Sequence, residues 1–76
     1  MTVYELSCIL RNMYDNAPHG DQTAMIHLFG IKYAKEIRIN GYTPKEILIA
    51  ANMPESYQVE INKGIKLANY VFVKQP

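Results

Sequence analysis

The chain has 76 residues, a formal net charge of +1 and a single cysteine. This length suits one domain with a modest core, and one cysteine excludes an internal disulfide and fits a reducing cytoplasm. The start lacks the basic-then-apolar order of a signal peptide, and no apolar run approaches the roughly 20 residues that span a membrane. We therefore expect one cytoplasmic domain over residues 1–76, with no membrane partner.

The charge is distributed unevenly along the chain. Residues 1–31 hold one basic side chain against three acidic ones, whereas residues 32–76 hold seven basic side chains against four acidic ones. The positive second half favours an anionic partner there, although the whole chain is far less basic than many nucleic-acid-binding domains.

The first predicted helix covers residues 2–16. Thr2 and Glu5 have the spacing of a capping box, in which each side chain bonds the backbone of the other. Apolar residues then recur at helical spacing and form one stripe. The Ala17-Pro18 pair ends this helix, because a residue that precedes proline resists the helical conformation.

The second predicted helix covers residues 21–39, with Asp21 as its N-cap. It is apolar around much of its circumference, which is typical of the buried centre of a small bundle. Gly30 costs about 1 kcal/mol of helix propensity relative to alanine, and close approach of another helix would compensate for it. Asn40-Gly41 supplies the left-handed residue that ends the helix.

The third predicted helix covers residues 44–51 and precedes a tight turn. Thr43 and Glu46 form a second capping box, and Pro44 occupies the first helical position, where its missing N–H costs nothing. Asn52 can adopt the left-handed conformation, and Pro54 disfavours helix at the residue before it. Two helices joined by so short a turn cross steeply, as in a helix-turn-helix.

The fourth predicted helix covers residues 54–72. Its buried seam is expected to comprise Tyr57, Ile61, Ile65, Ala68 and Phe72, with Gly64 allowing another helix to approach. The tail around Val71 and Val73 is β-prone, so the helix end is expected to fray or to form a short strand. The predicted fold is all-α: a compact four-helix domain whose third and fourth helices form a helix-turn-helix.

No pattern in the chain indicates catalysis or a metal site. His19 and His27 share no helical face, Cys8 lies elsewhere, and no Cys-x-x-Cys or His-x-x-x-His spacing occurs. His19 is most simply a turn residue, His27 a helix-surface or hydrogen-bonded residue rather than a base, and Cys8 a small hydrophobe. We expect no enzyme activity, no catalytic residue, no metal and no cofactor.

The fourth predicted helix carries the candidate DNA-reading face. In a DNA-binding helix-turn-helix, the second helix lies in the major groove, where Asn and Gln pair with adenine and Lys neutralises phosphate. Such side chains are equally what any solvated helix face carries. The candidate DNA-binding residues are Lys45, Ser56, Gln58, Asn62, Lys63 and Lys66.

The segment 47–61 resembles the helix-turn-helix of bacterial DNA-binding regulators. Small residues stand where the two helices meet, Asn52 takes the place of the usual glycine, and Ile61 matches an inward anchor. The other anchor position holds the polar Gln58, so Tyr57 must substitute for it. The whole chain also resembles small helix-turn-helix-like bacterial domains that accompany restriction or mobile-element functions, on its Ile-His-Leu-Phe-Gly-Ile-Lys-Tyr-Ala and Ser-Tyr-x-x-Glu-Ile-x-Lys-Gly-Ile stretches. The resemblance implies DNA binding, transcription regulation or DNA processing.

The alternative function is a non-catalytic protein-interaction or dimerisation module without DNA binding. Six tyrosines, two phenylalanines and four methionines are many for so small a core. Tyrosine and methionine are enriched at interfaces, although tyrosines also cover core edges with the hydroxyl in water. The two functions are compatible, because such DNA binders commonly act as homodimers. The dimer surface would be the first helix or the tail 70–73.

Overall fold

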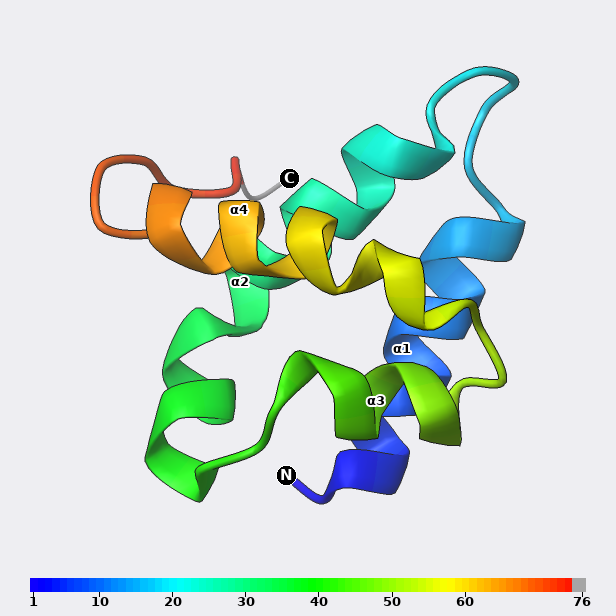
Figure 1. Cartoon of the computed structure of the whole chain (residues 1–76). Helices are drawn as coiled ribbons and strands as arrows, with labels where there is room; N and C mark the ends of the chain where they lie inside the picture. The colour runs from blue at the N-terminus through cyan, green and yellow to red at the C-terminus, as the bar shows by residue number, and fades with distance from the viewer. Residues whose placement is uncertain (75–76) are drawn as a thin grey trace.

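The computed structural model describes residues 1–74, which form four α-helices and one short 3₁₀ helix. The helices are α1 (Val3–Asp15), α2 (Gln22–Asn40), α3 (Pro44–Ala50) and α4 (Gln58–Leu67), and the 3₁₀ helix η1 (Glu55–Tyr57) leads into α4. The predicted all-α class is confirmed. Figure 1 shows α4 lying across α2, with α3 below α4 and α1 on the right of the view.

The crossing of α2 and α4 is built on two glycines. A Cβ atom on Gly30 would lie 2.7 Å from the carbonyl oxygen of Ile61 and 2.9 Å from the Cα atom of Gly64. A Cβ atom on Gly64 would collide with the carbonyl oxygen of His27. Backbone therefore packs directly on backbone here, which confirms the predicted close approach and compensates for the low helix propensity of glycine.

One hydrophobic core joins all four helices. α2 packs against both α1 and α4, while α3 packs against α1 and closes the remaining side. Burying these apolar side chains is the main stabilising contribution in a chain of this size. The fully buried core side chains are Leu6, Leu10, Ile26, Phe29, Ile47, Leu48 and Ile61.

Local capping signals fix three of the helix ends as predicted. Both capping boxes are present: Thr2 pairs with Glu5 and Thr43 with Glu46. Gly41 ends α2 in the left-handed conformation, with φ of 69°. Asp21 occupies the N-cap position of α2, as predicted, but its side chain forms no capping hydrogen bond.

The fourth helix is shorter than predicted. Pro54 is extended, with ψ of 135°, so η1 and then α4 begin after it, and α4 ends at Leu67 rather than at residue 72. β-branched Val71 and Val73 favour extended backbone, and residues 68–70 form turns. The prediction that Phe72 is buried is wrong, because its side chain is 97% exposed. Within residues 1–74, the tail forms no strand.

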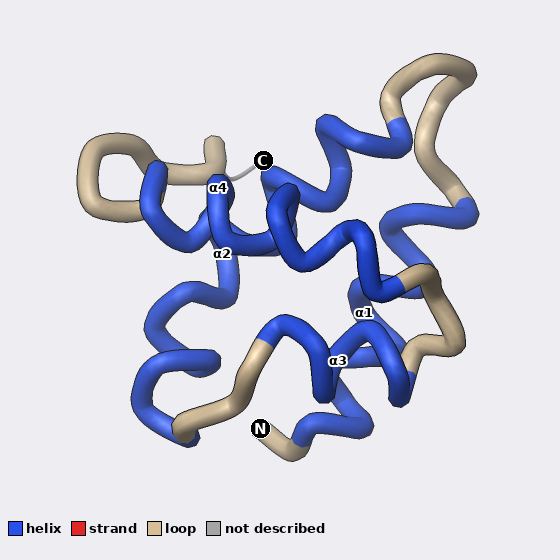
Figure 2. Tube along the Cα trace, viewed as in Figure 1, coloured by secondary structure: helices blue, strands red, loops and turns tan. Residues whose placement is uncertain are grey.

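Cys8 is exposed on α1, so it does not pack into the core as the predicted small hydrophobe would. Figure 2 shows that the loop 16–21 and the segment 68–74 project away from the helices. Among residues 1–74, no helix combines the length and the apolar character that crossing a bilayer requires.

Candidate nucleic-acid interface

The turn between α3 and η1 is held by backbone hydrogen bonds. Asn52 has φ of 55°, the only positive value at a non-glycine residue within residues 1–74. The amide of Met53 donates to the carbonyl oxygen of Leu48 at 3.0 Å, and that of Asn52 donates to Ile49 at 3.1 Å. Met53 is buried, so a hydrophobic contact secures the corner. The predicted bend at this position is confirmed.

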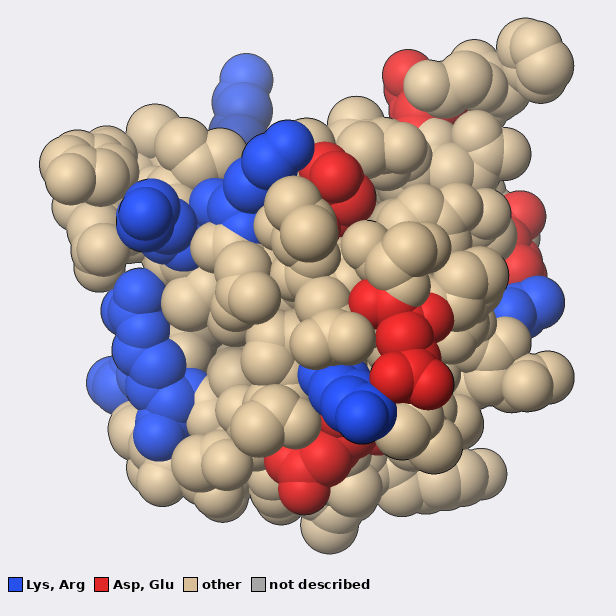
Figure 3. All heavy atoms as spheres, in the orientation of Figure 1, with Lys and Arg blue, Asp and Glu red and all other residues tan. Residues whose placement is uncertain are grey.

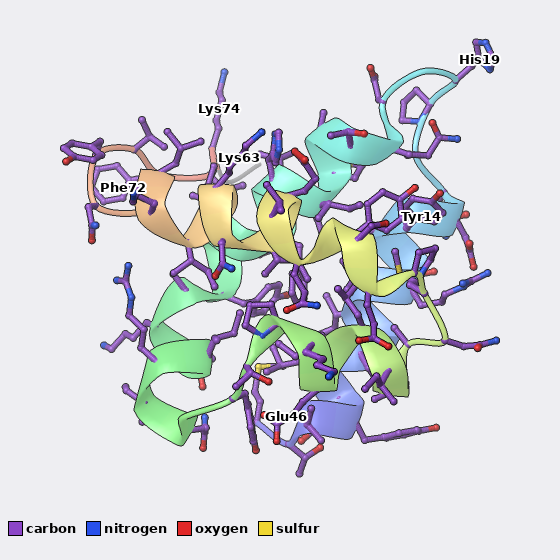
Figure 4. All side chains as sticks on the ribbon, viewed as in Figure 1. Tyr14, His19, Glu46, Lys63, Phe72 and Lys74 are labelled. Atoms are coloured by element: carbon purple, nitrogen blue, oxygen red, sulfur yellow. The ribbon has the colours of Figure 1, made fainter. Side chains whose placement is uncertain are left out.

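Two side chains of helix α1 contact the turn between α3 and α4. The Arg11 guanidinium donates a hydrogen bond to the carbonyl oxygen of Asn52 at 3.2 Å. The hydroxyls of Tyr14 and Tyr57 lie 3.0 Å apart, and their rings pack at 5.7 Å between centroids. Figure 4 shows Tyr14 beside the chain where α4 begins. Tyr57 thus packs against the core at the start of α4, and Gln58 beside it is half-buried.

The structure places most predicted site residues on the surface of η1 and α4. Ser56, Asn62, Lys63 and Lys66 are exposed, whereas Gln58 is half-buried and therefore less outward than expected. Figure 4 shows Lys63 projecting from the edge of α4 that faces away from α3. A shallow hollow of about 290 Å³ on α4 is lined by Val59, Asn62, Lys63 and Lys66.

Two of the three predicted phosphate-binding lysines face carboxylates. The Nζ atom of Lys45 lies 3.6 Å from Glu55, and that of Lys63 lies 3.6 Å from Glu60. These lysine side chains are both 58% exposed, so each pair is screened by solvent and contributes little stability. An approaching phosphate would compete with these carboxylates, which lowers the affinity that the lysines can supply.

Glu60 also connects α4 to α2. Its Oε1 atom lies 2.7 Å from Nε2 of His27, and this hydrogen bond lowers the pKa of Glu60 below its ordinary value of 4.5, with Lys63 adding a smaller effect. Of the two predicted alternatives for His27, a surface residue or a hydrogen-bonded one, the structure shows the hydrogen-bonded one. Three or more His, Cys, Asp or Glu side chains that could hold a metal do not come together anywhere in residues 1–74.

The Glu60–His27 contact makes the stability of the fold depend on pH. Because the pKa of Glu60 is lower in the folded chain than about 4.5 in the unfolded chain, its stabilisation is complete above pH 4.5 and is lost as pH falls through the depressed value. We expect Glu60→Gln to remove the pH-dependent stabilisation that the ionised Glu60 contributes. Urea unfolding between pH 7 and pH 3 should therefore show a smaller loss of stability for the variant than for the natural chain, whereas Asn62→Ala should keep the natural profile.

A second group of basic residues lies outside the predicted site. Lys32, Lys35 and Arg38 are exposed on α2, and their spacing of three residues is the sequence signal that places them on one helix face. Figure 3 shows basic side chains over α2 and over the second half of α4, while acidic side chains gather near the α3–α4 turn. Positive charge therefore extends away from the start of α4, where base contacts are expected.

The chain belongs to the HTH-like domain family, whose model matches residues 2–74. That match covers nearly every residue of the chain, and the four helices with a tight turn before the last one agree with it. Searches of curated proteins and of solved structures each found no match.

Proposed function

We propose that this protein binds duplex DNA through the exposed face of α4, with α3 and α4 as the two helices of the helix-turn-helix. The observation that carries the proposal is the sharp, braced turn at Asn52 in a chain of the HTH-like domain family. Such a turn holds the second helix in a fixed orientation, in which it can lie in the major groove.

The side chains of this face divide into two roles. Asn62 is exposed and can pair bidentately with adenine, and Ser56 and Gln58 are the remaining candidates for base contacts. Lys63 and Lys66 lie on the same helix and can contact phosphates, while Lys45 at the start of α3 can hold the backbone on the other side of the groove. Glu55 and Glu60 stand among these residues, so the affinity is expected to be low.

The test is fluorescence anisotropy with labelled duplex DNA over a series of salt concentrations. Three lysine–phosphate contacts predict that a fourfold rise in salt weakens binding about 40-fold, because counterions are released from the phosphates. The double variant Lys63→Glu/Lys66→Glu should lose DNA binding at low salt. Its urea unfolding midpoint should equal that of the natural chain, because both side chains are exposed.

The matched control reverses the same amount of charge on α2. We expect Lys32→Glu/Lys35→Glu to weaken DNA binding only slightly, through the overall charge. If the natural chain does not bind DNA at low salt, or if both double variants lose binding equally, then α4 is not a DNA-reading helix.

We further infer that the protein is non-catalytic, acts in the bacterial cytoplasm, and serves transcription regulation or a DNA-processing system. A homodimer would place two copies of α4 in successive major grooves, with the exposed face of α1 around Tyr4 as the contact. Light scattering on the purified chain distinguishes a monomer from this dimer.

The alternative function, a protein-interaction module, is favoured by one group of side chains. Tyr70 and Phe72 are 80% and 97% exposed, although both are large and carry apolar rings. Exposed apolar side chains that cluster on one segment commonly mark a contact with a partner. A folded chain that binds a protein and fails to bind DNA at low salt would establish this function in place of the first.

A further inference from the structure

A groove runs between α2 and the tail that follows α4. Its volume is about 650 Å³, and its lining includes Ile31 and Ala34 of α2 and Ala68, Val71 and Phe72 of the tail. Figure 4 shows Phe72 on this tail, on the outside of the molecule. Because these apolar side chains form a concave surface rather than a scattered set, the groove can receive the apolar side chains of another molecule.

Three basic side chains from one face of α2 also line this groove. Lys32, Lys35 and Arg38 are all exposed. Arg38 is held in place, since its guanidinium donates a hydrogen bond to the carbonyl oxygen of Ile65 at 2.9 Å. No carboxylate within residues 1–74 forms an ion pair with any of these three. The groove therefore combines an apolar lining with three positive charges that no carboxylate of residues 1–74 pairs with.

We infer that this groove binds a short acidic segment of a partner protein, one that carries apolar side chains among its carboxylates. The carboxylates would pair with Lys32, Lys35 and Arg38, and the apolar side chains would cover Val71 and Phe72. This complementarity of charge and polarity is the basis for specificity at such a surface. The site is separate from the outward face of α4, so it does not depend on DNA binding.

Other occupants fit the groove less well. A second copy of this chain that presented the same groove would bring the three basic side chains of α2 against their own counterparts, which is repulsive. Duplex DNA offers phosphates for the lysines but no apolar surface for Phe72. An acidic segment with apolar side chains matches both the basic side chains and the apolar lining of the groove.

The test selects short peptides from a random library on the immobilised full chain at low salt. We expect the enriched peptides to combine Asp or Glu with large apolar residues. Fluorescence polarisation of a selected peptide should show binding about tenfold weaker to Lys32→Glu/Lys35→Glu and about tenfold or more weaker to Phe72→Ser, which loses an apolar contact. Lys63→Glu/Lys66→Glu serves as the control and should keep most of the peptide affinity.

The inference would be overturned if the enriched peptides lacked acidic residues, or if peptide binding survived in both groove variants. It would also be overturned if Phe72→Ser lost the binding of duplex DNA or of anionic lipid vesicles that the natural chain shows, because the groove would then serve one of those ligands. Far-ultraviolet circular dichroism of each variant checks that it is folded, and Phe72 is exposed enough for the serine variant to remain so. Failure of the DNA proposal leaves this result unaffected, because the two experiments change different faces.

Discussion

Replacing Gly64 by alanine is expected to destabilise the fold by about 2 kcal/mol or more. The added methyl group would collide with the carbonyl oxygen of His27 and lie 2.9 Å from the Cα atom of Gly30. Overpacking of this kind typically costs 1–3 kcal/mol in a side-chain core, and here the obstacle is backbone, which cannot change rotamer. Alanine recovers about 1 kcal/mol of helix propensity, which does not offset a backbone collision.

Thermal unfolding followed by circular dichroism measures this effect. For a chain of this size, a loss of 2 kcal/mol lowers the melting temperature by about 10 °C. Asn62→Ala is the control, because Asn62 is exposed on the same helix and its replacement should change stability by no more than about 0.5 kcal/mol. A Gly64→Ala variant as stable as the natural chain would mean that α2 and α4 can separate freely.

Replacing Phe29 by alanine is expected to destabilise the fold by about 3–5 kcal/mol. Phe29 is fully buried in the middle of α2, and its ring packs on Tyr33 at 5.4 Å between centroids. Truncation of a buried phenylalanine costs about 3–5 kcal/mol, through lost apolar burial and the cavity left behind. A domain of this length has a total stability of about 4–11 kcal/mol, so this loss is expected to be a large fraction of the free energy of unfolding.

Phe72→Ala provides the matched control for Phe29→Ala. The same atoms are removed, but Phe72 is 97% exposed, so the free energy of unfolding in urea should change by no more than about 0.5 kcal/mol. Equal losses for the two variants would show that the tail packs into the core in solution. Such a result would also remove the exposed ring on which the proposed groove depends.

Features determined by neighbouring residues could be predicted from the sequence. Both capping boxes, the left-handed Asn52 and the stop at Gly41 depend on backbone conformation and on side chains within a few residues. The periodic apolar stripe likewise predicted the buried face of α1, and the apolar circumference of α2 predicted its place at the centre of the bundle. Even the close helix approach at Gly30 and Gly64 was predictable, because glycine inside a helix needs compensation.

The candidate site was less predictable, because its properties depend on distant partners. Sequence spacing placed Gln58 outward, whereas in the structure it is half-buried at the start of α4, directly after the 3₁₀ helix. The pairing of Lys45 with Glu55 joins two helices across the turn, and no local pattern indicates it. Whether the six predicted residues contact DNA remains a prediction that the salt series tests.

By itself, the sequence determined the helices, their caps and the sharp bend before the last helix, because short-range sterics and hydrogen bonds decide those features. Only the tertiary structure decided that α4 stops at Leu67 and that Phe72 lies beside the basic face of α2. The physical reason is that burial and charge pairing depend on which surfaces meet in space. The helical spacing of apolar residues predicted that Phe72 is buried, but the helix ends at Leu67 and the chain then turns away from the core.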